Sequence, residues 1–294
     1  MRIPFFSAIH ESAQRCFAPR ANVRPQSIGV VISTYNHPAW LEKTLWGYFA
    51  QDFHECPLEL VIADDGSTHE TRDLIDRYRN ETGWNIRHVW HEDRGFRKCV
   101  ILNRAIRESS SEYLIFTDHD CVPEPKFVEK HYRYAAPGFF VSGRYSKIPL
   151  SPSQNLTRED IQTGRAFQKS WLVQNGFFPS SRKCPVQPPW RSTLCNLLTT
   201  TQATWNGANS SGWKKDLVAV NGFNEDMTYG GLDVELGYRL ENLGVHGRQV
   251  RYSIFCLHLD HGRPYCNPEI LAQNRVILQN TRRKKIVRTP HGLD

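Results

Sequence analysis

The chain has 294 residues, of which 39% are hydrophobic and 23% charged, a composition typical of a globular protein rather than of a disordered or fibrous one. No apolar run approaches the roughly 18 residues that a membrane-spanning helix needs. The formal net charge of +7 admits a phosphorylated substrate or an anionic membrane surface. Nucleic acid is excluded as the expected partner, because the sequence contains no nucleic-acid-binding motif.

The first part of the chain, residues 27–136, is predicted to consist of strand–helix units that bind a nucleotide sugar. Apolar strands recur about every 30 residues, with apolar residues at helical spacing between them, and this pattern is typical of repeated βαβ units. We therefore expect an α/β, Rossmann-like and mostly parallel sheet flanked by helices. The predicted strands are Ser27–Ser33, Leu58–Asp64, Ile86–Trp90 and Tyr113–Asp118, and the predicted helices begin near Pro38, Ser67, Arg97 and Pro125.

The second part of the chain, residues 137–265, is predicted to complete the same domain on its acceptor side. Its prolines interrupt the periodicity, and no internal repeat is evident. A glycine after the last apolar position is a typical helix C-cap, as Gly244 would be. The predicted elements are a helix over Arg158–Gln174, a helix over Asp233–Leu243 and a strand over Val250–Leu257, with an N-terminal extension over 1–26 and a basic C-terminal tail over 266–294.

The N-terminus and the cysteines indicate a cytoplasmic protein. The apolar stretch after Met1 is short and is interrupted by His10 and Glu11, which does not fit a secretory signal peptide. The eight cysteines include no Cys-x-x-Cys pair, so free thiols in a reducing compartment are favoured over disulfides. The alternative location is the inner face of the membrane.

Acidic residues follow two of the predicted strands, as Asp64-Asp65 and as Asp118-His119-Asp120. In an open parallel sheet, ligands bind outside the carboxyl ends of the strands. Residues two apart in an extended segment face the same side, so Asp118 and Asp120 are candidates to address one Mg²⁺ or Mn²⁺. A solvated loop is the alternative, but the position at a strand end favours a cation site.

Two further motifs carry candidate chemistry. His258 and His261 are three residues apart, and ligation by histidine together with carboxylate favours Mn²⁺ over Mg²⁺. The alternative is one core and one surface histidine. Asp233 follows Gly230-Gly231-Leu232 at a predicted helix start, where it is either an N-cap or a reactive carboxylate.

Taken in order, these motifs resemble those of the family 2 glycosyltransferases with a GT-A fold, in particular the branch whose C-terminal part is galactosyltransferase-like. The resemblance covers roughly residues 27–263. It is carried by Val30–Asn36, Val61–Ser67, Gly95–Lys98 with Asn103, Asp118–Asp120, Gly207–Asn209, Gly222–Glu225, Gly230–Asp233 and His258–His261.

The resemblance implies an inverting, metal-dependent transferase. It would move a hexosyl or N-acetylhexosaminyl group from a UDP-sugar to a hydroxyl of a glycan or lipid-linked saccharide, with Mn²⁺ or Mg²⁺ stabilising the departing diphosphate. Asp233 matches the family's catalytic base. The implied donor contacts are Thr34 and Tyr35 at the uracil, Asp64 at the base, Arg97 at the base or phosphates and Asp118 at the ribose or metal; the implied metal ligands are Asp120, His258 and His261.

The chain departs from the family pattern beside the predicted base. The family usually has an acidic residue before the catalytic aspartate and often a tryptophan before the glycines, where this chain has Leu232 and Tyr229. The acceptor is therefore open, and Glu235 is a candidate to supply the missing carboxylate. The alternative function is a catalytically inert sugar-nucleotide or glycan-binding protein on the same fold.

Tryptophans and a basic run leave two further questions open. The tryptophans of the second half are candidates to stack on sugar rings, although core packing is their commoner use. The basic run is interpreted as a solvated tail, with peripheral membrane contact through residues 282–288 as the alternative. The tryptophans are Trp171, Trp190, Trp205 and Trp213, and the basic run is Arg282–Lys285 with Arg288.

Overall fold

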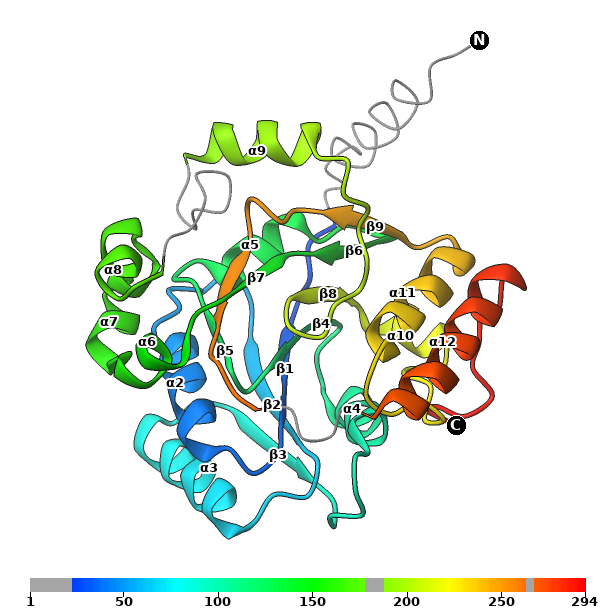
Figure 1. The fold of residues 1–294 in the computed structure, drawn as a ribbon, viewed down its shortest axis with the longest axis horizontal. Coiled ribbons are helices and arrows are strands. Elements are labelled where there is room, and N and C mark those ends of the chain that lie inside the picture. The colour runs from blue at the N-terminus through cyan, green and yellow to red at the C-terminus, as the bar shows by residue number, and fades with distance from the viewer. Residues whose placement is uncertain (1–22, 178–187, 263–266) are drawn as a thin grey trace.

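The computed structural model describes residues 23–177, 188–262 and 267–294 as a mixed α/β fold, in which helices flank a large central sheet (Figure 1). Most of the predicted N-terminal extension lies outside the described residues, as do Cys16, Cys184 and Cys266. The described cysteines Cys56, Cys99, Cys121, Cys195 and Cys256 are free thiols.

Ten strands and eleven α-helices are assigned in the described ranges. The strands are β1 (Ile28–Thr34), β2 (Leu58–Asp64), β3 (Ile86–Trp90), β4 (Tyr113–Asp118), β5 (Cys121–Pro123), β6 (Phe139–Ser142), β7 (Arg144–Lys147), β8 (Ser210–Trp213), β9 (His246–Gln249) and β10 (Phe255–His258). The helices are α2 (Pro38–Phe49), α3 (His69–Thr82), α4 (Lys98–Glu108), α5 (Phe127–Tyr134), α6 (Leu150–Asn155), α7 (Arg158–Gln162), α8 (Lys169–Gln174), α9 (Pro189–Leu198), α10 (Lys214–Ala219), α11 (Leu232–Leu243) and α12 (Pro268–Arg283), with a 3₁₀ turn at Arg165–Phe167.

The strand order brings the predicted acidic strand ends together. The seven-stranded sheet has the order β3-β2-β1-β4-β8-β6-β9, and the three-stranded sheet has the order β5-β10-β7. Strands β1 to β4 are parallel, which confirms the predicted βαβ half, whereas β8 runs antiparallel to β4 and β6. Thr34 pairs with Asp64, and Ser33 pairs with Asp118. The carboxyl ends of β1, β2 and β4 therefore meet at one edge.

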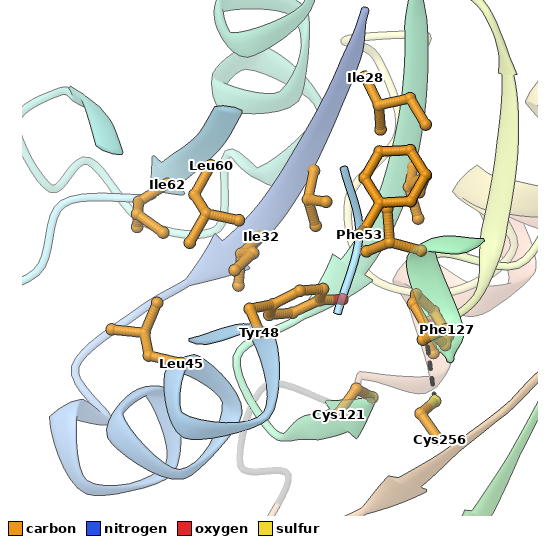
Figure 2. Packing of buried hydrophobic residues seen from close by; sticks show 14 of the residues in the cluster. Ile28, Ile32, Leu45, Tyr48, Phe53, Leu60, Ile62, Cys121, Phe127 and Cys256 are labelled. Carbon is orange, nitrogen blue, oxygen red and sulfur yellow. Dashed lines mark hydrogen bonds between the residues drawn. The ribbon is translucent and has the colours of Figure 1, made fainter. Parts of the chain in front are cut away.

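The core explains why the first strand is apolar throughout. In a strand, alternate side chains point to opposite faces of the sheet. Val30 and Ile32 of β1 pack with α2 and α3 on one face, and Val31 packs with α4, α10 and α11 on the other. Figure 2 shows the first face, where Leu45 and Tyr48 of α2 cover the side chains of β1 and β2. Burial on both faces fixes the register of the strand whose end carries the site.

Two predicted elements of the second half are wrong. The helix predicted over Arg158–Gln174 is broken into α7, a 3₁₀ turn and α8, because Gly164 adopts a left-handed conformation with φ 72°. The strand predicted over Val250–Leu257 is present only over Phe255–Leu257, in β10; residues 250–254 connect β9 to β10, and these two strands belong to different sheets. A turn in which the Ile254 amide donates to the Val250 carbonyl separates them, because the chain must change direction to pass from one sheet to the other.

The C-terminal segment packs against the domain. Helix α12 lies beside α11 (Figure 1), and the Thr281 hydroxyl donates to the Glu235 carboxylate at 2.9 Å. Leu293 returns to the second core cluster, while the side chains of Arg282–Lys285 stay exposed. Among the described helices, none combines the length and apolar character that crossing a membrane requires.

Candidate active site

Asp118 is held at the end of β4 by two donors. The Ser33 hydroxyl, at the end of β1, donates to Asp118 Oδ1 at 2.6 Å, and Lys98 Nζ, from the first residue of α4, donates to the same oxygen at 2.5 Å. Burial opposes ionisation of Asp118, but the Lys98 ammonium outweighs it and lowers the pKa of Asp118. The carboxylate is therefore ionised and fixed in orientation.

Lys98 is the functional residue that sequence reasoning missed as a site residue. Burial would lower the pKa of its ammonium, but Asp118, Asp233 and Asp120 together raise that pKa above its usual value. Lys98 thus carries a permanent positive charge among three carboxylates that come from β4, the turn after it and α11. The only sequence signal for it is its place at a helix start, directly after Arg97.

Asp120 lies at the centre of a candidate metal site. Its Oδ2 is 2.7 Å from His261 Nε2 and 3.5 Å from His258 Nε2. The ligand atoms of these three residues lie within 4.8 Å of one another, as do those of Asp118, Asp120 and Cys121. The two imidazole rings are stacked at 5.6 Å with an interplanar angle of 10°. The structure thus brings together the three residues predicted as metal ligands.

The orientation of the histidine rings fits a metal. His258 Nδ1 faces the Leu259 carbonyl at 2.8 Å, and His261 Nδ1 faces the Gly262 carbonyl at 2.7 Å. Because these carbonyls accept hydrogen bonds from Nδ1–H, the Nε2 of each neutral ring would be free to ligate a cation beside Asp120. Two imidazole nitrogens and carboxylate oxygens form a donor set suited to Mn²⁺.

The expectation that Asp118 and Asp120 face the same side because their segment is extended is wrong. Asp118 ends β4, but His119 and Asp120 form a turn rather than an extended segment. The turn is held because the His119 amide donates to the Ser33 carbonyl at 2.8 Å and the Thr44 hydroxyl donates to the His119 carbonyl at 2.7 Å. A fixed turn, not strand alternation, directs Asp118 and Asp120 to one place.

Asp233 is a partly buried residue at the start of α11. It is the second residue of the helix, and the N-cap is Gly231 in a left-handed conformation with φ 85°. Asp233 is therefore not the N-cap. Burial raises the pKa of Asp233 to about 6, the Lys98 ammonium opposes this rise, and Asp118 adds to it. Its Oδ1 is buried without a hydrogen-bond partner, which leaves that oxygen available to a ligand.

Gly207 provides the space for the Asp233 carboxylate. A Cβ atom at position 207 would lie 2.8 Å from Asp233 Oδ1, closer than the two atoms can approach without a shift. Gly207 belongs to one of the sequence motifs noted above, and its role is to allow this close approach.

The predicted uracil contacts lie at the ends of β1 and β2. Tyr35 is 46% exposed, and its hydroxyl donates to Asp93 Oδ2 at 2.9 Å. The Thr34 hydroxyl is buried without a partner. Arg97 is the N-cap of α4, and its amide donates to Asp65 Oδ2 at 2.9 Å.

Asp64 is separate from the carboxylates around Lys98. It is fully buried, its Oδ1 accepts a hydrogen bond from the Ser67 amide at 2.8 Å, and its Oδ2 is 2.9 Å from His88 Nε2. Contact between Asp64 and a base stays a prediction.

Leu232 and Glu235 both face the interior rather than the candidate site. Leu232 is 5% exposed and packs with Met227 and Leu236 in the second core cluster. Both carboxylate oxygens of Glu235 accept hydrogen bonds from Arg239 Nε, at 2.9 and 3.0 Å. The hypothesis that Glu235 supplies the missing acceptor carboxylate is therefore wrong. Trp171, Trp205 and Trp213 are buried in the core, whereas Trp190 is exposed.

Comparison with known proteins matches this chain to sugar-transferring enzymes. A family model described as glycosyl transferase family 2 matches residues 29–181. A validoxylamine A glucosyltransferase of Streptomyces hygroscopicus subsp. limoneus is 30% identical over 234 residues, which are 77% of this chain and 50% of that protein. A chondroitin synthase of Escherichia coli is 25% identical over 79% of this chain and 34% of that protein. The chain spans about half the length of the curated relatives it matches first.

Two solved structures share the fold. The mannosyltransferase PcManGT from Pyrobaculum calidifontis, in complex with GDP-Man and Mn²⁺, has a TM-score of 0.58 and 17% identity, over 96% of this chain and 80% of that one. TarS residues 1–349 from S. aureus, in complex with UDP-GlcNAc, has a TM-score of 0.55 and 14% identity, over 91% of this chain and 68% of that one. At these identities the likeness shows a common fold.

Proposed function

The chain belongs to glycosyltransferase family 2, and we propose that it transfers a hexosyl or N-acetylhexosaminyl group from a UDP-sugar to a hydroxyl of a glycan or lipid-linked saccharide. Similarity to a glucosyltransferase and to an N-acetylglucosaminyltransferase supports this class of reaction, as does the GT-A fold shared with solved sugar-nucleotide complexes. The observation that carries the proposal is that the ligand atoms of Asp120, His258 and His261 lie within 4.8 Å of one another, beside an Asp118 that is paired with Lys98.

The donor would bind at the carboxyl ends of β1, β2 and β4. Asp120, His258 and His261 would hold Mn²⁺ or Mg²⁺, and the two imidazoles favour Mn²⁺. When bound, such a cation supplies Lewis-acid charge next to the diphosphate. The remaining donor contacts are proposed as Asp118 at the ribose, Thr34 and Tyr35 at the uracil, Asp64 at the base and Arg97 at the base or phosphates.

Asp233 would act as the general base. Its Oδ1, buried and without a partner, would accept the proton of the acceptor hydroxyl as that oxygen attacks the anomeric carbon. The bond from this carbon to the diphosphate oxygen breaks on the opposite face, so the configuration inverts. With a pKa of about 6, the carboxylate is mostly ionised at neutral pH and still basic enough to take a proton. The Lys98 ammonium opposes a further rise of that pKa.

Titration of UDP into the protein tests the donor and metal assignment. We expect wild-type protein to bind UDP at least about tenfold more tightly with Mn²⁺ than without it. Asp120→Ala should lose this difference, because it removes the carboxylate that both histidines face. Asp52→Ala, at a side chain that is 95% exposed, is the control and should behave as wild type. Equal UDP affinity for wild type and Asp120→Ala, with and without Mn²⁺, would overturn the assignment.

The alternative of a catalytically inert binding protein depended on Leu232. Because Leu232 packs in the core beside a retained Asp233, its presence does not indicate a lost catalytic group. Peripheral membrane contact through residues 282–288 stays a prediction. Its supporting observation is that the side chains of Arg282–Lys285 are exposed at the end of α12.

A further inference from the structure

Helix α9 is amphipathic, but its polar side faces the protein and its apolar side faces outward. Its polar residues Ser192 and Asn196 are buried, at 6% and 4% exposure. Its large apolar residues Trp190, Leu194 and Leu198 are 69%, 45% and 59% exposed. These three residues are spaced by four positions, so they form one stripe along the helix. The helix therefore presents its apolar face outward.

Hydrogen bonds fix α9 in this orientation. Asn196 Nδ2 donates to the Ser253 hydroxyl at 2.8 Å, and the Tyr252 amide donates to Asn196 Oδ1 at 2.9 Å. Both partners lie in the turn between β9 and β10. Rotating α9 to bury its apolar stripe would break these bonds at a buried side chain, which is costly. These hydrogen bonds therefore hold the apolar stripe of α9 on the outside of the molecule.

The segment of the sequence that contains α9 is basic. From Ile161 to Lys215 the sequence contains seven lysines and arginines and no aspartate or glutamate. Arg191 is exposed on α9 itself, and Arg248 lines the small cavity beneath the helix. Figure 1 shows α9 at the outer edge of the molecule, across the domain from α3 and apart from α12. An apolar stripe within a stretch free of acidic residues suits an apolar partner with a negatively charged surface.

We propose that α9 docks on an anionic phospholipid surface. Trp190, Leu194 and Leu198 would enter the boundary between head groups and acyl chains, where the tryptophan ring is favoured. Arg191 would face the lipid phosphates, contributing on the order of 1 kcal/mol near such a surface. A second copy of the chain is a poorer occupant, because α9-to-α9 contact would bring two basic, acid-free stretches together.

Vesicle sedimentation with two charge-matched variants tests this surface. Wild-type protein should bind phosphatidylcholine vesicles that contain phosphatidylglycerol at least about tenfold more tightly than pure phosphatidylcholine vesicles, and added salt should weaken the binding. Trp190→Glu with Leu194→Glu should lose about tenfold or more. Leu150→Glu with Val218→Glu is the control; it changes the charge equally, at residues that are 48% and 45% exposed on other helices, and should bind within about twofold of wild type.

A conservative variant separates insertion of the helix from an effect on folding. Brominated phosphatidylglycerol should quench tryptophan fluorescence on binding, and Trp190→Phe should lose most of that quenching while still binding. Equal vesicle binding by the two glutamate variants, indifference to phosphatidylglycerol, or greater loss in the control would overturn the proposal. Absence of vesicle binding together with a dimer that the α9 variant abolishes would also overturn it, because a second copy would then cover the stripe. A lower melting temperature of the α9 variant would overturn it as well, because it would mean that the chain itself covers the stripe.

Discussion

Replacing Asp233 with asparagine should stabilise the protein at neutral pH while removing its activity. Burial raises the pKa of Asp233 from 3.8 to about 6, so the folded state favours the protonated carboxyl more than the unfolded chain does. The associated stability is fully present below about pH 4 and is lost as the pH rises through about 6. Asparagine is neutral at every pH, so the variant should keep this contribution to the free energy of unfolding as the pH rises.

The size of the effect follows from the shift. At about 1.4 kcal/mol for each pKa unit, the upper bound is about 3 kcal/mol. Because the residue is only partly enclosed, we expect about 1–3 kcal/mol. Urea unfolding of wild type and Asp233→Asn, in EDTA, should show equal stabilities near pH 4 and a more stable variant at pH 8. Working with the difference between the two proteins cancels the titration of all other groups.

The control for this comparison is Asp52→Asn. The Asp52 side chain is 95% exposed, so its substitution should change the free energy of unfolding by less than about 0.5 kcal/mol at either pH. A stability difference between wild type and Asp233→Asn that is absent, or that is the same at pH 4 and pH 8, would refute the argument that Asp233 is a desolvated carboxylate.

Three further substitutions test Lys98 in the candidate site and the buried Glu235–Arg239 pair. Lys98→Met should move the midpoint of the kcat/KM–pH profile upward, because the ammonium lowers the pKa of Asp233; a shift of one unit would reduce kcat/KM below the midpoint about tenfold, and an unmoved midpoint would remove Lys98 from this role. Glu235→Gln should lower the free energy of unfolding by about 3–5 kcal/mol, because it leaves the Arg239 guanidinium buried without its charge partner. Thr281→Val, which loses only one hydrogen bond to Glu235, should cost about 1 kcal/mol in the same urea titration.

The first half of the fold could be predicted because its strands are buried on both faces. Such strands are continuously apolar, as Ile28–Thr34 is, and nothing else of that length in a globular protein has the same pattern. The strand predicted over Val250–Leu257 began too early, because Val250 and Ile254 are buried as strand residues are, although they lie in the connection before β10. Gly164 likewise interrupts a helical pattern through a left-handed conformation that its neighbours do not reveal.

The candidate site could be predicted in its residues but not in its geometry. Asp118 and Asp120 were identified from their position after a strand, yet a turn, not strand alternation, brings them together. Lys98 was not identified as a site residue, because a lysine in a first helical turn is usually solvated. Its role depends on α4 and α11 placing Lys98 and Asp233 beside the end of β4, which is a tertiary property.

The measurement that tests the central claim most directly is the anomeric configuration of the sugar released when the enzyme hydrolyses a UDP-sugar. Proton NMR, recorded before mutarotation, should show the β-anomer released from α-linked UDP-glucose or UDP-N-acetylglucosamine in the presence of Mn²⁺. Asp233→Asn should release none while still binding UDP. Release of the α-anomer, or undiminished turnover by Asp233→Asn, would contradict an inverting transfer that uses Asp233 as its base.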